Sequence, residues 1–159
     1  MKYTNHANRG KSFERQIQIM HNLYWGRGQG LIQKIAVPTK IISGRIIREK
    51  STIDFLGALE NLPIAFDAKE ESSTNFNLKR IYKDQLKALQ GFYYGGSRAF
   101  ILLNMKVLNG IYIIPYQNIV NLHRQEIKSV SRDYLTAHES LKVCNSNQLP
   151  DYLKILKGK

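Results

Sequence analysis

Residues 52–69 carry the segment TIDFLGALENLPIAFDAK, in which two apolar runs are separated by Glu60-Asn61. Short apolar runs that contain β-branched and aromatic residues and are bounded by turn residues predict β-strands. We therefore expect strands at Thr52 to Leu56 and at Ile64 to Lys69, joined by a turn near Glu60-Asn61. The two strands would be antiparallel neighbours.

Two aspartates occupy matching places on these strands. Side chains alternate across a strand, so Asp67 and Lys69 share one face of the second strand. If the turn is symmetric about Glu60-Asn61, Asp54 lies directly opposite Asp67, with Cβ atoms roughly 4.5–5.5 Å apart. Carboxylates that close repel each other, and a divalent cation such as Mg²⁺, which prefers oxygen ligands, would compensate.

Lys69 has two interpretations that the spacing leaves open. Beside a metal it would neutralise charge on a scissile phosphate or activate the attacking water. In an ordinary polar strand face it would simply pair with Asp67, because a D-x-K triplet also occurs by chance.

The next amphipathic stretch, residues 77–90, predicts a helix with a glutamine on its apolar side. Gln85 falls in the middle of the apolar arc, so its amide needs hydrogen-bond partners or a metal. A satisfied buried amide and a metal ligand are both compatible with this position. The arc consists of Leu78, Ile81, Tyr82, Leu86 and Leu89.

The remaining periodicities predict a layered α/β or α+β domain with a mixed sheet, formed as one domain by residues 1–159. Phe13, Ile17, Met20 and Tyr24 predict a helix over residues 12–25. The other expected elements are a strand at Leu31 to Val37, a hairpin of Ala99 to Met105 with Ile111 to Ile114 around Asn109-Gly110, and short helices at 115–123, 131–138 and 151–156.

The charge of the chain favours a polyanionic partner. Lys plus Arg number 24 against 12 Asp plus Glu, a formal net charge of +12, and such a field attracts nucleic acid. Residues 39–50 predict a short basic hairpin that projects from the body. The expected DNA-binding residues are Arg9, Lys11, Lys40, Arg45, Arg48 and Lys50; Lys79, Arg80 and Lys83 are interpreted first as the solvated face of a helix and second as DNA contacts.

Several other classes of protein are disfavoured. The single cysteine, Cys144, excludes an internal disulfide framework, and the histidines lack zinc-site spacing. No glycine-rich phosphate loop predicts a nucleotide cofactor, and no apolar run predicts a membrane span or a membrane partner. We expect a protein that acts in the cytoplasm of a bacterium or of the host of a phage.

At these residues the chain resembles the RecU family of Holliday junction resolvases. The motifs run in family order along most of the chain: Asn8-Arg9-Gly10 with Glu14, Lys34 through Pro38-Thr39, Ser51-Thr52-Ile53-Asp54-Phe55, Phe66-Asp67-Ala68-Lys69-Glu70, Phe76-x-Leu78-x-x-Ile81 leading to Asp84-Gln85, and Asp151-Tyr152-Leu153-Lys154.

The resemblance implies a restriction-endonuclease-like core, a homodimer, and Mg²⁺-dependent cutting of four-way DNA junctions by paired symmetric nicks, with Mn²⁺ as a substitute metal. By position, it implies a metal shell of Thr52, Asp54, Asp67 and Gln85, with Lys69 as the transition-state stabiliser. Glu14 matches an acidic residue near the family's active centre.

Two departures from the family pattern stand out. Asp67 takes the place of a longer Glu, and residues 39–50 are shorter than the family's projecting stalk. The alternatives are therefore another restriction-like Mg²⁺-dependent DNA nuclease that cuts duplex, mismatched or branched DNA, and a basic DNA-binding protein without catalysis.

Overall fold

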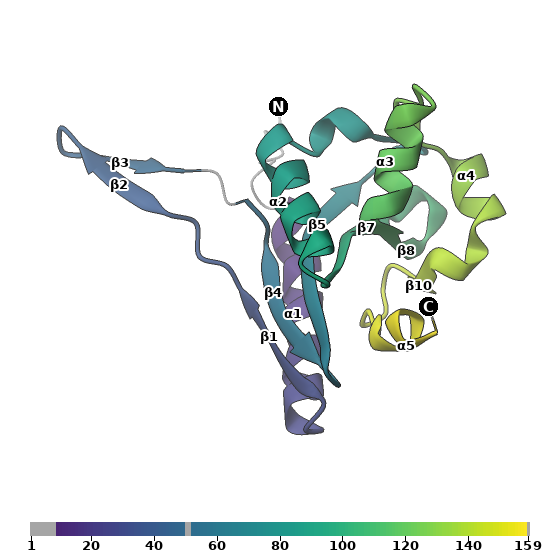
Figure 1. The fold of residues 1–159 in the computed structure, drawn as a ribbon, viewed down its shortest axis with the longest axis horizontal. Helices are drawn as coiled ribbons and strands as arrows, with labels where there is room; N and C mark the ends of the chain where they lie inside the picture. The colour runs from purple at the N-terminus through teal and green to yellow at the C-terminus, as the bar shows by residue number, and fades with distance from the viewer. Residues whose placement is uncertain (1–8, 50–51, 159) are drawn as a thin grey trace, which may run out of the picture.

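The framework of the protein is a six-stranded sheet with helices on both faces (Figure 1). The structure, a computed structural model, describes residues 9–49 and 52–158. Strands β5 and β7 are parallel and all other neighbours in the sheet are antiparallel. The mixed α/β sheet that was predicted is therefore confirmed. Its strands, in spatial order, are β1 (Gly30–Lys34), β4 (Phe55–Leu59), β5 (Leu62–Glu71), β7 (Arg98–Met105), β8 (Gly110–Pro115) and β10 (Lys142–Cys144).

The turn between β4 and β5 has the predicted symmetry. Leu59 pairs with Leu62 and Phe55 with Phe66, while Glu60 and Asn61 both have positive φ, at 46° and 67°. Two positive φ values define the type I′ turn that suits a tight hairpin.

The predicted first strand, Thr52 to Leu56, was wrong in its position, because β4 runs from Phe55 to Leu59. Neighbouring β1 ends at Lys34, opposite Phe55, so the residues before Phe55 have no ladder partner on that side. Ile53 is nevertheless buried in the core, which accounts for the misleading alternation of apolar and polar residues.

Helices α1 (Arg9–Gly26) and α5 (Leu153–Lys157) cover one face of the sheet (Figure 1). The apolar stripe of α1 is entirely buried and confirms the helix predicted over residues 12–25. It belongs to the same core cluster as Phe66 and Phe100, whose rings stack with centroids 4.8 Å apart. This core fixes the angle at which β5 presents its opposite face.

The opposite face of the sheet is covered by α2 (Lys83–Tyr94), α3 (Tyr116–Arg124) and α4 (Arg132–Ala137). The prediction of one helix over residues 77–90 was wrong at its start. Residues Phe76–Asn77 form β6, which pairs with β9 (Ser129–Val130), and Leu78–Arg80 form the 3-10 helix η2. The Asn77 side chain accepts a hydrogen bond from the backbone N–H of Lys79, at 2.9 Å, and caps this short helix.

The later elements were predicted with small errors. Strands β7 and β8 form the expected hairpin, joined by η3 (Lys106–Leu108) and by Asn109, which has a φ of 45°. The three short helices are α3, α4 and α5, with bounds shifted by one or two residues. The elements η4 (Glu139–Leu141) and β10 were not predicted.

Strands β2 (Thr39–Ile42) and β3 (Arg45–Arg48) form a hairpin that projects far from the body (Figure 1). Ser43 and Gly44 form its turn, with φ values of 52° and 72°. The predicted projection is confirmed over these residues, while Lys50 lies outside the described part of the chain. Among the helices of residues 9–49 and 52–158, none is long and apolar enough to cross a membrane.

Candidate active site

Asp54 and Asp67 come together across the β4–β5 hairpin, as their symmetric spacing predicted. The last paired residues are Phe55 and Phe66, so the next position on each strand is an aspartate. The Asp54 carboxylate accepts a hydrogen bond from the backbone N–H of Ala68, at 2.9 Å. Asp54 is thereby held against the strand segment that carries Asp67.

Asp67 is a fully buried carboxylate, with none of its side chain exposed. Burial raises its pKa to about 7, and the neighbouring charge of Asp54 raises it further, while Lys69 opposes both effects. The Nζ of Lys69 lies 2.7 Å from Oδ2 of Asp67. In the absence of a metal, this ion pair is what compensates the aspartates, as one of the two interpretations of Lys69 predicted.

Gln85 joins the same cluster from the first turn of α2. Its Nε2 donates to Oδ1 of Asp67 at 3.1 Å, and its Oε1 accepts from Nζ of Lys69 at 3.2 Å and from the backbone N–H of Tyr82 at 3.1 Å. Two donors facing Oε1 and a carboxylate facing Nε2 fix the orientation of the amide. Gln85 is thus a satisfied buried amide here, and its oxygen would have to leave these donors to bind a metal.

The residues present fit a Mg²⁺ site. Oδ2 of Asp67 is buried and has no hydrogen-bond partner of good geometry among the described residues, although Lys69 lies close by. Mg²⁺ is commonly held by one or two carboxylates together with water and substrate phosphate. Across residues 9–49 and 52–158 no group of three or more His, Cys, Asp or Glu could hold a metal. That absence disfavours a zinc site, which draws mostly on Cys and His ligands.

Two of the predicted site residues lie at the margin of this cluster. Thr52 is exposed, two residues before Asp54. Glu14, on α1, forms an ion pair with Lys34 of β1, which lies opposite Phe55 in the sheet. Glu14 therefore lies near the strand that follows Asp54, and its catalytic role stays a prediction, as does the metal-binding role of Thr52.

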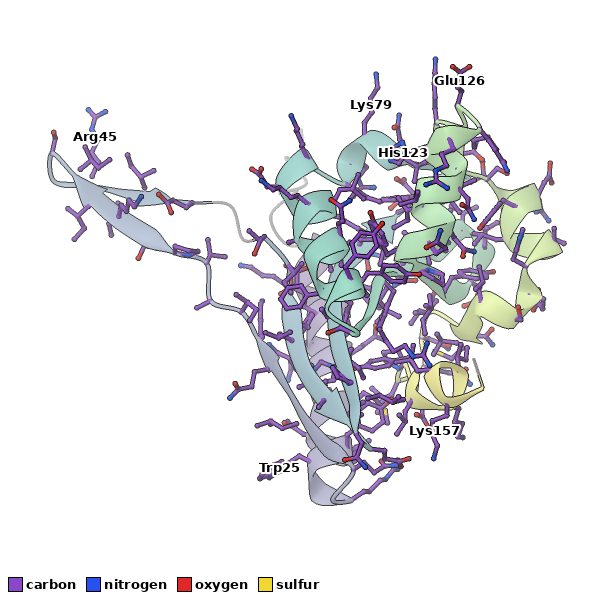
Figure 2. All side chains as sticks on the ribbon, viewed as in Figure 1. Trp25, Arg45, Lys79, His123, Glu126 and Lys157 are labelled. Carbon is purple, nitrogen blue, oxygen red and sulfur yellow. The ribbon has the colours of Figure 1, made fainter. Side chains whose placement is uncertain are left out.

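Of the residues expected to bind DNA, Lys11 and Arg45 are exposed. Arg45 lies at the tip of the projecting hairpin (Figure 2), and Lys40 on the same hairpin forms an ion pair with Glu49. The side chains of Arg9 and Arg48, and all of Lys50, lie outside what the structure describes.

The interpretation of Lys79, Arg80 and Lys83 as one solvated helix face was wrong. Lys79 and Arg80 belong to η2, and only Lys83 belongs to α2. Arg80 pairs with Glu71 at 2.5 Å and donates to the backbone carbonyl of Glu70 at 3.0 Å. Arg80 is thus tied to the end of β5.

Sequence reasoning missed the apolar character of the hairpin. It exposes Ile41, Ile42, Ile46 and Ile47, with Ile41 77% and Ile46 72% exposed. The signal was present as two isoleucine pairs flanking the turn at Ser43-Gly44. An isolated two-stranded hairpin is marginally stable in water, and clustered apolar side chains mark interaction surfaces.

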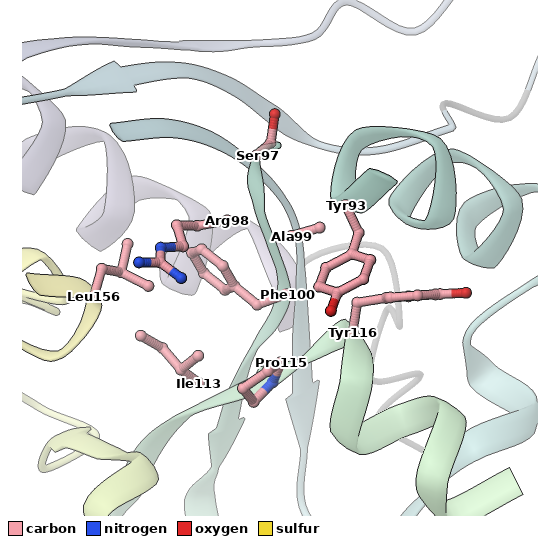
Figure 3. Close-up of a pocket in the computed structure, with 9 residues that line it drawn as sticks. All are labelled: Tyr93, Ser97, Arg98, Ala99, Phe100, Ile113, Pro115, Tyr116 and Leu156. Carbon is pink, nitrogen blue, oxygen red and sulfur yellow. The ribbon is translucent and has the colours of Figure 1, made fainter. Parts of the chain in front are cut away.

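An apolar cavity of about 100 Å³ lies elsewhere, near the start of β7 (Figure 3). Tyr93, Pro115 and Leu156 are among its lining residues, and no carboxylate lines it. It opens beside Arg98, which is level with Ile64 at the other end of the ladder from Lys69. The aspartate cluster therefore has no part in this cavity.

The model of the family described as recombination protein U matches residues 8–158. The chain belongs to the RecU family. Curated relatives named Holliday junction resolvase RecU include the protein of Staphylococcus saprophyticus, 29% identical over 78% of this chain and 67% of its own. The protein of Bacillus cytotoxicus is 25% identical over 98% of this chain and 86% of its own.

Among solved structures, the Holliday junction resolvase Hjc of Archaeoglobus fulgidus is similar with a TM-score of 0.47 and 16% sequence identity, covering 69% of this chain and 75% of Hjc. That likeness is too distant to carry an argument about the site. Membership of the RecU family rests on the family model, which spans the aspartate cluster and the hairpin.

Proposed function

We propose that this chain is a junction-resolving DNA endonuclease that hydrolyses phosphodiester bonds with Mg²⁺ at Asp54 and Asp67. The observation that carries the proposal is the meeting of these two carboxylates, beside Lys69, in a chain of the RecU family. The relatives of the chain are named as Holliday junction resolvases. A four-way junction is therefore the substrate expected first.

The two aspartates are the residues that would hold the metal. Bound Mg²⁺, or Mn²⁺ in its place, would supply positive charge to the scissile phosphate and orient the attacking water. Asp67 brings an Oδ2 atom that lacks a well-aligned hydrogen bond, and Asp54 is held beside it by the Ala68 N–H. Gln85 would position Asp67 through their hydrogen bond, and Thr52 lies close along the chain.

Lys69 would change partner during the reaction. Without a metal its ammonium group is paired with Asp67 and Gln85. Neutralisation of Asp67 by a cation weakens that pairing, so the ammonium group becomes available to the phosphate oxygen on which charge develops. Positive charge placed there stabilises the transition state without a covalent intermediate on the protein.

We further propose that the active form is a homodimer. Symmetric nicks in two strands require two active sites related by a two-fold axis, and most homo-oligomers have such closed symmetry. Size-exclusion chromatography with light scattering should then give twice the chain mass, and a monomer that cuts both strands of one junction would contradict this assignment.

A second candidate is a nuclease with the same chemistry and a different DNA preference. The observation in its favour is the short hairpin, whose paired strands are only Thr39–Ile42 and Arg45–Arg48. Four-way junction, flap, linear duplex and single strand, incubated separately with Mg²⁺, distinguish the two. Paired nicks confined to the junction support resolution, whereas equal cutting of linear duplex supports the second candidate.

A further inference from the structure

An open groove of about 810 Å³ lies between η2, the start of α2 and the residues that follow α3. Apolar side chains, including Ile81 and Leu86, line part of it, and Lys79, Lys83 and Lys128 supply positive charge. Glu126 is its acidic lining residue. The groove therefore presents three ammonium groups against one carboxylate.

These lysines differ from most others in the described part of the chain. Lys34, Lys40, Lys69, Lys106 and Lys157 each pair with a carboxylate within 4.0 Å. Lys79, Lys83 and Lys128 form no such pair with a described residue, and all three are exposed. Their charge is thus not compensated within residues 9–49 and 52–158, which suits an anionic ligand.

The groove begins where the aspartate cluster ends. Lys83 lies two residues before Gln85, whose amide binds Asp67. Between them and the catalytic lysine lies Tyr82, with its ring centroid 5.7 Å from Nζ of Lys69. Figure 2 shows Lys79, His123 and Glu126 at one end of the molecule, remote from Trp25 and Lys157 at the other.

We infer that this groove binds the duplex arm next to the cut and holds its phosphates against Lys79, Lys83 and Lys128. The inference rests on the proposed function. Duplex DNA carries one negative charge per roughly 1.7 Å of its axis, so an arm that leaves the active site presents a continuous row of phosphates. Such contacts fix the register of the arm without reading its sequence.

The test compares a triple variant, Lys79→Ala/Lys83→Ala/Lys128→Ala, with a control that removes three charges at the opposite end, Arg27→Ala/Lys154→Ala/Lys157→Ala. Binding of a long-armed four-way junction is measured in EDTA over a range of salt concentrations, so that no cutting occurs. The triple variant should bind more weakly, and its slope of log affinity against log salt should fall by up to about 2.7, at about 0.9 per phosphate contact. The control should resemble the wild type.

Arm length provides the second readout. When the arms are cut back stepwise, the wild type should lose affinity until it equals the triple variant, which should respond little to the same shortening. Equal salt slopes for the triple variant and the wild type would overturn the inference, and would favour an acidic protein segment as the occupant. So would a loss of affinity that is the same at every arm length.

The outcome is separable from that of the proposed function. A wild-type protein that never cuts DNA with Mg²⁺ removes the nuclease proposal, whereas the arm-length response in EDTA reports on the groove alone. Thermal unfolding of both triple variants checks that their folds are intact, as expected because the altered groove side chains are exposed.

Discussion

Asp67 combines full burial with a neighbouring carboxylate, two features that disfavour its charged form. Folded-state pKa values raised in this way lower stability as pH rises, because the unfolded chain releases the proton first. For Asp67 the range runs from the ordinary value of 3.8 to about 7. A residue that costs stability at neutral pH in this position indicates selection for a ligand that neutralises it.

Asp67→Asn should therefore stabilise the metal-free protein at pH 8 and abolish the stabilisation by Mg²⁺. The neutral amide removes the buried charge, which is expected to raise the free energy of unfolding by about 1–3 kcal/mol, at 1.36 kcal/mol per pKa unit less the lost pairing with Lys69. Thermal melts in EDTA and in Mg²⁺ measure both effects. Asp133→Asn, an exposed residue in the first turn of α4, is the matched control, and a less stable Asp67→Asn protein in EDTA would contradict this account.

His21 provides a second buried titratable group, on the face of the sheet away from the aspartates. Its Nε2 lies 2.8 Å from the Tyr152 hydroxyl, and burial lowers its pKa from 6.5 to about 4. Below pH 6.5 the unfolded chain takes up a proton that the folded chain refuses, so stability should fall as pH drops toward 4. The expected loss is about 3 kcal/mol.

Denaturant melts between pH 7 and pH 4 measure this loss (pH values are roughly those that bracket the shift). A His21→Phe variant, with no titratable ring, should lose less stability over the same interval, whatever its absolute stability. His123→Gln, at an exposed position of α3, should follow the wild type. Parallel pH profiles for all three proteins would show that His21 is not the group responsible.

At the scale of the elements, β1 and β4 approach so closely that only glycine fits at one position. A Cβ at Gly57 would lie 2.0 Å from the carbonyl oxygen of Leu31, whereas at Gly91 in α2 it would meet nothing within 4 Å. Gly57→Ala should separate β1 from β4 and destabilise the protein by about 1–3 kcal/mol. Gly91→Ala should stabilise it by roughly 0.5–1 kcal/mol. Chemical denaturation of the pair measures both, and equal effects of the two changes would contradict the assigned β1–β4 packing.

The projecting hairpin contributes to DNA binding in this account through Lys40 and Arg45. Changing both to alanine should weaken junction binding several-fold and leave thermal stability nearly unchanged, because both side chains are exposed. Gel-shift titration of a four-way junction measures the affinity. Arg27→Ala/Lys154→Ala serves as the control for loss of two charges, and equal affinity of the two double variants would count against a role for the hairpin.

Local pattern predicted those elements whose own residues carry the signal. The stripe of α1 and the turn at Glu60-Asn61 were confirmed because periodicity and turn chemistry are encoded within a few residues. The start of α2 and the bounds of β4 were not, because they depend on distant partners: β6 pairs with β9, and β1 ends at Lys34.

The candidate site shows the same division. The meeting of Asp54 and Asp67 followed from hairpin symmetry alone. The amide of Gln85 was placed inward by helical periodicity, although its orientation is set by Lys69 and Tyr82, which no spacing reveals. Its role as a metal ligand therefore stays a prediction.

At the scale of the whole molecule, the distribution of charge supports the location of the site. The net charge of +12 attracts DNA from any direction, so it cannot by itself place the substrate. The aspartate cluster and the lysine groove lie in succession along the residues that join β5 to α2. A substrate strand held at Lys69 would thus meet further positive charge at Lys83.

The central claim is that Asp54 and Asp67 form the metal centre of a nuclease. The measurement that tests it most directly is the rate at which a labelled four-way junction is nicked with Mg²⁺, for the wild type, Asp54→Ala and Asp133→Ala. The account predicts that Asp54→Ala lowers the rate by orders of magnitude while binding the junction at least as tightly, since a negative charge facing phosphate is removed. Asp133→Ala should cut at the wild-type rate, and undiminished cutting by Asp54→Ala would contradict the account.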